Sequence, residues 1–296
     1  MDYLQKYAYT PCGEEIASRI EAIASNLSSA GSPEVLRKCF SMMDLTTLHT
    51  NDTPESVRAL VDKANGVPAQ FPGCPFPASV CVFPNFASVV RDARASEELH
   101  VTTVAGYFPS SQSFLEVKVQ ECRLAVLNGA DEIDIVLALN AFMAGDYEAA
   151  SAEIRAMKSA IDSEAAACGR KVVLKVILET GLLGTPERIA QASFLAMEAG
   201  ADFIKTSTGK VEVNATPAAA LVMCECIRAY WEKTGRKVGF KAAGGISTAA
   251  DALGYYCIVS SVLGEQWLDK SLFRFGVSRL GNSLMSAIEQ KTIKYF

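Results

Sequence analysis

The chain has 296 residues, and half of them are hydrophobic, which is enough apolar surface to bury one large core. A formal net charge of −5 and the lack of any Lys/Arg run argue against nucleic acid as a partner. The apolar runs are short and interrupted, and the N-terminus lacks the apolar core of a signal peptide, so we expect a soluble, cytoplasmic chain with no membrane contact.

The first predicted unit is an N-terminal helical extension over residues 1–32. Its amphipathic helix is expected to begin behind Thr10-Pro11. Apolar residues recur in it at helical spacing: Ile16, Ile20, Ile23 and Leu27. Such a helix could plug the domain that follows or contact a partner subunit. Packing of an extra helix on that domain is the simpler expectation.

Residues 33–296 alternate short apolar runs with longer helical patterns, which is typical of repeated βα units around a parallel sheet. The runs begin at Phe40, Ser79, His100, Asp131, Lys171, Ala201, Lys237 and Phe273. Eight units predict a closed (β/α)₈ TIM barrel with an extra N-terminal helix. An open doubly wound sheet is the alternative, but no G-x-G-x-x-G follows the first run. The Pro- and Gly-rich segment 65–79 is predicted to be a loop.

Charged residues interrupt the predicted strands, where an unpaired buried charge costs several kcal/mol. They are Asp44, Asp134, Lys175, Lys205 and Lys241. Any one of them, taken alone, is equally compatible with a satisfied ion pair or a solvated strand end. Five on one barrel predict a charged cluster at its C-terminal mouth.

Clustered lysines disfavour one another's charge, so one of them can become a neutral amine near neutral pH. A neutral amine attacks carbonyl groups and forms a Schiff base, which is an electron sink for carbon–carbon cleavage. A nearby carboxylate can then move protons, directly or through one water.

Glycines after the last three predicted strands indicate a site for an anion. They lie in Gly209-Lys210, in Gly244-Gly245, and before Ser278 in the segment 276–278. Glycine lets backbone N–H groups approach phosphate oxygens, and the loops after strands seven and eight of a barrel are the usual phosphate site. A Gly-Gly pair by itself is also compatible with a simple tight turn.

The sequence offers no ligand set for a metal. Its two histidines, His49 and His100, are too few for a zinc site built from several imidazoles, and its nine cysteines match no metal-knuckle spacing. We therefore expect no metal, and we expect most cysteines to be small core residues.

Six segments together resemble deoxyribose-phosphate aldolase: "MDLTTL" at 43–48, "DEIDIV" at 131–136, "FMAGDY" at 142–147, "LKVILETG" at 174–181, "FIKTSTGK" at 203–210 and "GFKAAGG" at 239–245. They occur in that family's order and span roughly residues 34–285. The resemblance implies a class I aldolase without metal or cofactor, commonly a homodimer. Its substrate would be a sugar phosphate, 2-deoxy-D-ribose 5-phosphate, cleaved reversibly to D-glyceraldehyde 3-phosphate and acetaldehyde.

The resemblance also implies residue roles. Lys205 matches the Schiff-base lysine, Lys241 the second lysine that lowers its pKa, and Asp134 the proton-transferring carboxylate. The residues implied in substrate binding are Asp44, Thr46, Lys175, Thr208, Gly209, Lys210, Gly244, Gly245 and Ser278.

Four features depart from the family pattern. Ala242 stands where members often have proline, which should loosen the turn slightly, and Phe83 replaces a tyrosine found near the pocket in some members, so that hydroxyl is absent. Arg279 stands where some members have a small hydroxyl residue, and it either adds a phosphate contact or points to solvent. Tyr295 is followed by one more residue, whereas many members end in a tyrosine that reaches the active site; packing at a helix end is as good an interpretation.

Two other functions stay open. One is a Schiff-base aldolase for another acceptor aldehyde, because pocket shape sets that choice. The other is an aldolase-like barrel that acts as a binding or scaffold protein with reduced catalysis. Retention of the charged cluster argues against it, since unused buried charges would cost stability.

Overall fold

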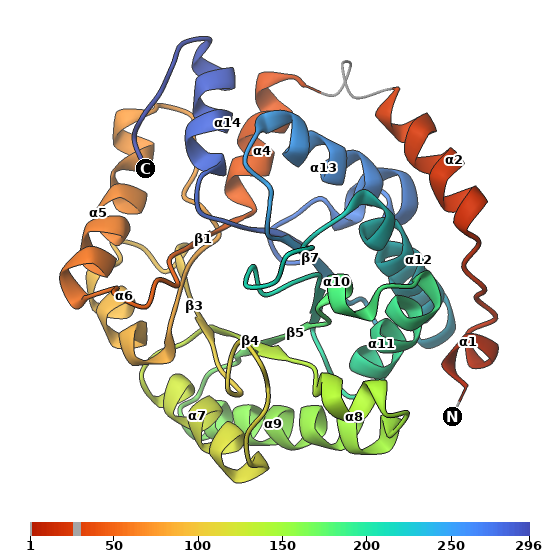
Figure 1. Cartoon of the computed structure of the whole chain (residues 1–296). Coiled ribbons are helices and arrows are strands. Elements are labelled where there is room, and N and C mark those ends of the chain that lie inside the picture. Colours follow the sequence, from red (N-terminus) through yellow and green to blue (C-terminus); the bar gives the residue numbers. More distant parts are fainter. Residues whose placement is uncertain (1, 26–30) are drawn as a thin grey trace.

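Eight parallel strands close into a barrel in chain order, with β8 paired back to β1 (Figure 1). They are β1 (Met43–Thr46), β2 (Ser79–Val82), β3 (His100–Val104), β4 (Glu132–Val136), β5 (Val173–Ile177), β6 (Phe203–Lys205), β7 (Gly239–Ala243) and β8 (Phe273–Val277). This computed structural model describes residues 2–25 and 31–296. The predicted (β/α)₈ barrel is confirmed, including its eighth strand at Phe273.

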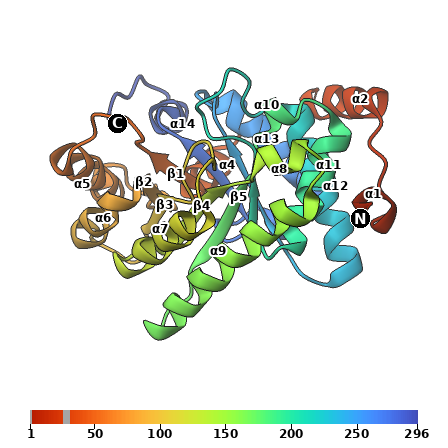
Figure 2. The same cartoon turned by 60° about the horizontal axis from the view of Figure 1, so that its bottom comes forward.

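Each strand is followed by a helix that covers the outside of the barrel (Figure 2). These helices are α5 (Pro54–Gln70), α6 (Ala87–Ala93), α7 (Leu115–Leu127), α9 (Tyr147–Ala167), α11 (Pro186–Glu198), α12 (Pro217–Thr234), α13 (Ala249–Leu263) and α14 (Leu280–Glu289). Short helices interrupt the loops at η1 (Pro84–Phe86), α8 (Leu139–Met143), α10 (Thr180–Leu183) and η2 (Glu265–Trp267). Thr-Pro pairs start α5, α11 and α12. The threonine hydroxyl accepts a hydrogen bond from a backbone N–H of the first turn, and the N–H that proline lacks would have no partner within the helix at this position.

Within the described residues, three helices precede the barrel: α1 (Tyr3–Lys6), α2 (Gly13–Ala24) and α4 (Pro33–Ser41). Helix α1 contacts α11, α2 contacts α12 and α13, and α4 contacts α13 and α14. In Figure 1, α1 and α2 run along the outer edge of the molecule, beside α11, α12 and α13. The predicted N-terminal helix is therefore present on the side of the barrel; Leu27 lies outside the described residues.

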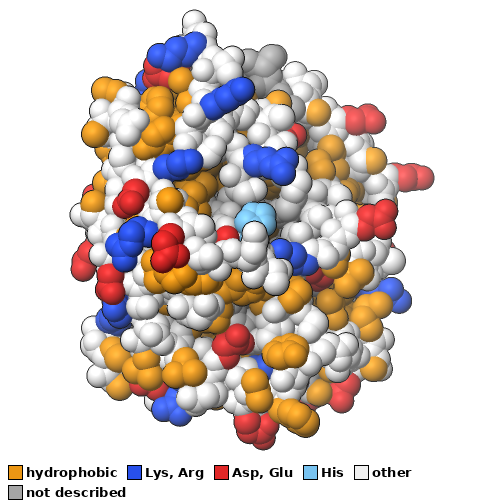
Figure 3. Space-filling model, turned by 60° about the vertical axis from the view of Figure 1, so that its left-hand side comes forward, with side chains coloured by type: hydrophobic (Ala, Val, Ile, Leu, Met, Phe, Trp, Pro, Cys, Tyr) orange, Lys and Arg blue, Asp and Glu red, His pale blue; other side chains and the backbone are white. Residues whose placement is uncertain are grey.

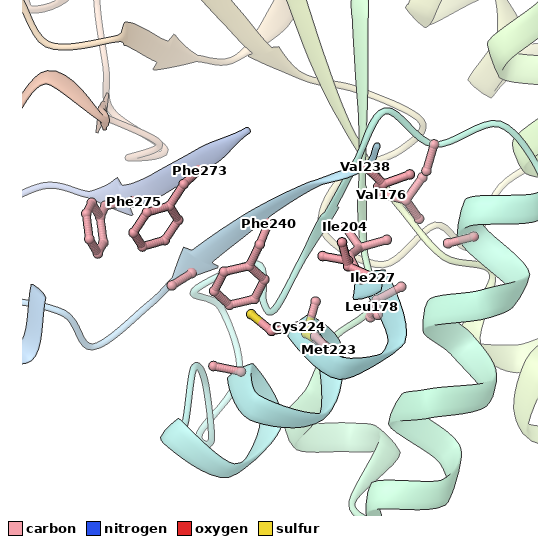
Figure 4. Close-up of a cluster of buried hydrophobic side chains, with 14 of the residues drawn as sticks. Val176, Leu178, Ile204, Met223, Cys224, Ile227, Val238, Phe240, Phe273 and Phe275 are labelled. Atoms are coloured by element: carbon pink, nitrogen blue, oxygen red, sulfur yellow. The ribbon is translucent and has the colours of Figure 1, made fainter. Parts of the chain in front are cut away.

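The hydrophobic core lies between the strands and the helices. Outward-pointing residues of β5 to β7, such as Ile204 and Phe240, pack against Met223, Cys224 and Ile227 of α12 (Figure 4). Because side chains alternate along a strand, the other half of each strand points into the barrel. Several of the side chains that point into the barrel are charged.

Two local predictions were wrong. Phe40 is not in the first strand but in α4, where Ser32 accepts an N–H from Val35 and Pro33 starts the helix. The predicted loop at 65–79 begins only after Gln70, because α5 continues through the intervening residues with Pro68 inside it near its C-terminal end.

The face shown in Figure 3 carries basic and acidic side chains interspersed with hydrophobic atoms rather than one dominant charge. None of the helices in the described parts of the chain is both long and apolar enough to span a bilayer.

The fold predicts a specific need for glycine at position 239. A Cβ there would lie 2.3 Å from the Phe203 ring, which is buried inside the barrel. We expect Gly239→Ala to lower the free energy of unfolding by about 1–3 kcal/mol, as overpacking does. Urea unfolding measures it.

Gly254→Ala is the matched control, because a Cβ at this position in α13 would meet nothing within 4 Å. It should raise the free energy of unfolding by about 0.5–1 kcal/mol. Equal effects of the two substitutions would contradict the packing argument.

Candidate active site

Strand register brings four of the predicted charged residues onto the inner face of the barrel. Asp134 on β4 is the register partner of Lys175 on β5, and Lys205 on β6 is the partner of Lys241 on β7. Partners in a parallel sheet point to the same side, so these side chains share the interior. All four are buried.

The Asp134 carboxylate joins the three lysines. Its Oδ2 accepts hydrogen bonds from Lys205 Nζ and Lys241 Nζ, each at 2.8 Å, and its Oδ1 accepts one from Lys175 Nζ at 2.9 Å. Burial by itself raises the pKa of Asp134, but the three ammonium groups outweigh it and hold that pKa well below its usual value. Asp134 is therefore ionised at any pH near neutral.

A second set of ion pairs involves residues that the sequence analysis did not single out. Arg274 on β8 binds Asp44 Oδ1 at 2.5 Å and Glu132 Oε1 at 2.6 Å. Glu132 also binds Lys175 at 2.5 Å, and Asp44 contacts Lys241. The signal was present, because Glu132 and Arg274 also interrupt apolar runs.

The interior thus holds four cations and three carboxylates. Burial disfavours each cation, but the carboxylates outweigh it for Lys175, Lys241 and Arg274 and raise the pKa of each. The pKa of Lys205 is lowered instead, first by burial and further by the charge of Lys241, against the attraction of Asp134. The only salt bridge of Lys205 among the described residues is to Asp134 Oδ2, an oxygen it shares with Lys241.

Lys205 is also the member of this cluster that reaches a pocket. The pocket has a volume of about 420 Å³ and opens at the C-terminal ends of the strands. Its lining includes the predicted residues Thr46, Lys205, Thr208, Gly209, Lys210, Gly244, Gly245 and Ser278. The other four predicted residues, Asp44, Asp134, Lys175 and Lys241, are buried and do not line it.

Part of the pocket wall can hold an anion. Gly244 has a left-handed φ of +85°, and a Cβ there would lie 2.6 Å from Asn214, so only glycine fits this turn. Arg279 lines the pocket at the N-terminal end of the ten-residue helix α14, where free N–H groups and the helix dipole favour negative charge. His49 is a lining residue that the sequence analysis missed.

Tyr295 lies elsewhere. Its hydroxyl donates a hydrogen bond to the Lys63 carbonyl oxygen on α5 at 2.8 Å. Its ring packs edge-on against the Phe71 ring, with the two ring centroids 5.2 Å apart. It does not line the pocket, so packing at a helix end describes its role in this structure.

In the described parts of the chain, no three His, Cys, Asp or Glu side chains are placed to hold a metal ion. His100, which begins β3, instead contacts Glu132 Oε1 through Nδ1 at 2.7 Å, as a polar neighbour at a strand end.

Comparison with known proteins agrees with this geometry. The profile of the DeoC/LacD family of aldolases matches residues 39–254, which include both Lys205 and Lys241. The chain belongs to this aldolase family. A protein of Caenorhabditis elegans named "Putative deoxyribose-phosphate aldolase" is 43% identical over 270 residues, which cover 90% of this chain and 86% of that protein.

Solved structures of the family share the barrel. A protein of Coccidioides immitis with the same name is 26% identical, covers 91% of this chain and 95% of its own, and has a TM-score of 0.66. One from Toxoplasma gondii, 24% identical over 87% of this chain and 98% of its own, has a TM-score of 0.73 and shows the likeness in fold.

The buried ion pairs predict a large cost for removing one member. Arg274→Met would leave Glu132 and Asp44 short of a cation, and breaking such a pair typically costs about 3–5 kcal/mol. We expect a loss of that size in the free energy of unfolding, measured with urea at neutral pH.

Arg155→Met is the control for this prediction. Arg155 pairs with Glu148 at the surface, and both side chains are exposed, so its removal should cost no more than about 1 kcal/mol. Equal losses in the two variants would mean that the interior charges contribute no more than surface ones.

Proposed function

We propose that this chain cleaves 2-deoxy-D-ribose 5-phosphate reversibly to D-glyceraldehyde 3-phosphate and acetaldehyde through a Schiff base on Lys205. The observation that carries the proposal is the position of Lys205, which is the one lysine of the buried cluster that lines the pocket and has a lowered pKa. The name of the C. elegans relative supports the substrate.

In the proposed reaction, the neutral amine of Lys205 attacks C1 of the open-chain sugar, and loss of water gives an iminium ion. The C2–C3 bond then breaks, its electron pair moves toward the iminium nitrogen, and the C3 hydroxyl loses its proton. Glyceraldehyde 3-phosphate leaves, and an enamine of acetaldehyde stays on Lys205. Protonation of the enamine at C2 and hydrolysis release acetaldehyde and regenerate the lysine.

Asp134 is the proposed proton carrier, because it lies 2.8 Å from Lys205 Nζ and its lowered pKa keeps it a carboxylate. It does not line the pocket, so the proton would pass through one water. Lys241, whose pKa is raised, would stay charged beside Lys205 and favour the neutral form of its amine.

The phosphate is proposed to bind at the glycine-lined part of the pocket wall. Gly209, Gly244, Gly245 and Ser278 would donate backbone N–H groups, and Lys210 would supply a charge. Arg279 at the start of α14 would add a charge-assisted contact.

Release of glyceraldehyde 3-phosphate from 2-deoxyribose 5-phosphate tests the proposal, with chelator present. We expect the wild-type protein to turn over the substrate at a rate that the chelator does not change. We expect no turnover in Lys205→Leu, because leucine has no amine to form the Schiff base. The circular dichroism spectrum should show that the variant is folded.

If the wild-type protein releases nothing from 2-deoxyribose 5-phosphate, the stated substrate is wrong. Activity with a sugar phosphate of another length would then favour a different acceptor aldehyde. Full turnover in Lys205→Leu would overturn the Schiff-base assignment.

We also propose that the chain forms a homodimer. A stripe on α7 and at its start leaves large apolar side chains exposed: Phe114 at 80%, Val117 at 48%, Leu124 at 47% and Leu127 at 51%. Apolar stripes of this kind favour a protein partner. Sedimentation equilibrium should give twice the chain mass, and a monomer at high concentration would contradict the proposal.

A further inference from the structure

Glu179 is a buried carboxylate in a strained backbone conformation near the pocket. It precedes helix α10, has φ 56° and ψ 60°, and is only 2% exposed. A left-handed conformation is unfavourable for residues other than glycine, and it persists only where surrounding contacts hold it. The contacts of Glu179 therefore indicate what this conformation is for.

Both of its carboxylate oxygens bind one residue of the loop after β6. Thr208 N donates to Oε1 at 3.1 Å, and Thr208 Oγ1 donates to Oε2 at 2.5 Å. The same hydroxyl accepts from Lys210 N at 3.1 Å. The carboxylate thus fixes Thr208, and Thr208 fixes the backbone two residues further on.

This loop lines part of the pocket and contacts two other loops. Lys210 Nζ donates to Leu48 O, in the loop after β1, at 2.7 Å. Asn214, further along the same loop, packs so closely against Gly244, in the loop after β7, that a Cβ on Gly244 would clash. A shift of Thr208 would therefore also disturb the loops after β1 and β7.

Glu179 does not line the pocket, so it cannot touch a substrate there. Its pKa is raised mainly by burial, while the hydrogen bonds from Thr208 and the charge of Lys205 act in the opposite direction. Glu179 can therefore affect the pocket only through the loop after β6, which it holds by its hydrogen bonds with Thr208.

We propose that Glu179 is a positioning residue that clamps the loop after β6, so that Gly209 and Lys210 meet the substrate phosphate in the geometry required for tight binding. The inference rests on the proposed function and adds a residue to it. The clamp needs a carboxylate, because Thr208 donates two hydrogen bonds and Glu179 has two acceptor oxygens for them. An uncharged amide side chain has only one acceptor oxygen.

Glu179→Gln replaces one of these acceptors with a donor and should lose one charge-assisted hydrogen bond to Thr208. Because such a bond contributes about 1.5–3 kcal/mol, we expect KM for 2-deoxyribose 5-phosphate to rise at least about tenfold. The value of kcat should change far less. With unphosphorylated 2-deoxyribose, kcat/KM should stay near the wild-type value, because that substrate does not use the phosphate contacts.

Thr208→Val removes the other side of the clamp and should raise the same KM. The double variant should be no worse than the more impaired single one, because both substitutions break one interaction. Thr208→Val also keeps the proposal testable if Glu179→Gln does not fold.

Glu225→Gln is the matched control. Glu225 is a buried carboxylate on α12 that accepts from Tyr9 at 2.5 Å and pairs with Arg19, away from the pocket. Its substitution should lower the melting temperature and leave the KM for both substrates unchanged.

Each outcome bears on a different claim. An unchanged KM in Glu179→Gln, equal losses with the phosphorylated and unphosphorylated sugars, or additive losses in the double variant would overturn the positioning role. Absence of turnover in the wild-type protein would instead refute the proposed function.

Discussion

The carboxylate of Asp134 is the interaction on which the site depends. It accepts hydrogen bonds from three lysines on three successive strands, and it is buried completely. Without it, Lys205 would have no carboxylate partner, and Lys175 and Lys241 would keep only Glu132 and Asp44, which would leave the buried charges poorly compensated. Its position also determines where the ammonium groups of Lys175, Lys205 and Lys241 can lie.

The excess of one cation over the carboxylates explains how a barrel full of ion pairs can still offer a reactive amine. Arg274 binds Asp44 and Glu132, Lys175 binds Glu132 and Asp134, and Lys241 binds Asp44 and Asp134. If Lys205 loses its proton, the cluster becomes neutral rather than charged. The fold therefore favours deprotonation at the one lysine that lines the pocket.

The sequence predicted the barrel because parallel strands and their helices leave a regular hydrophobic pattern. It predicted the lysines because a cation in an apolar strand is costly and therefore informative. Glu132 and Arg274 also interrupt apolar runs, but their partners Asp44 and Lys175 lie on other strands and are brought to them by the register of the closed barrel. No sequence pattern indicates that the backbone of Glu179 is in the left-handed conformation. The contact that accompanies this conformation is with Thr208, which follows the next strand along the chain.

The most direct test of the account identifies the lysine that forms a Schiff base. Native protein at neutral pH would be treated with acetaldehyde and sodium borohydride, digested, and mapped by mass spectrometry. The account predicts a single ethyl group on Lys205, with Lys175 and Lys241 unmodified. An ethyl group on Lys241 with Lys205 unmodified, or modification of surface lysines alone, would contradict the claim that the interior charges select Lys205.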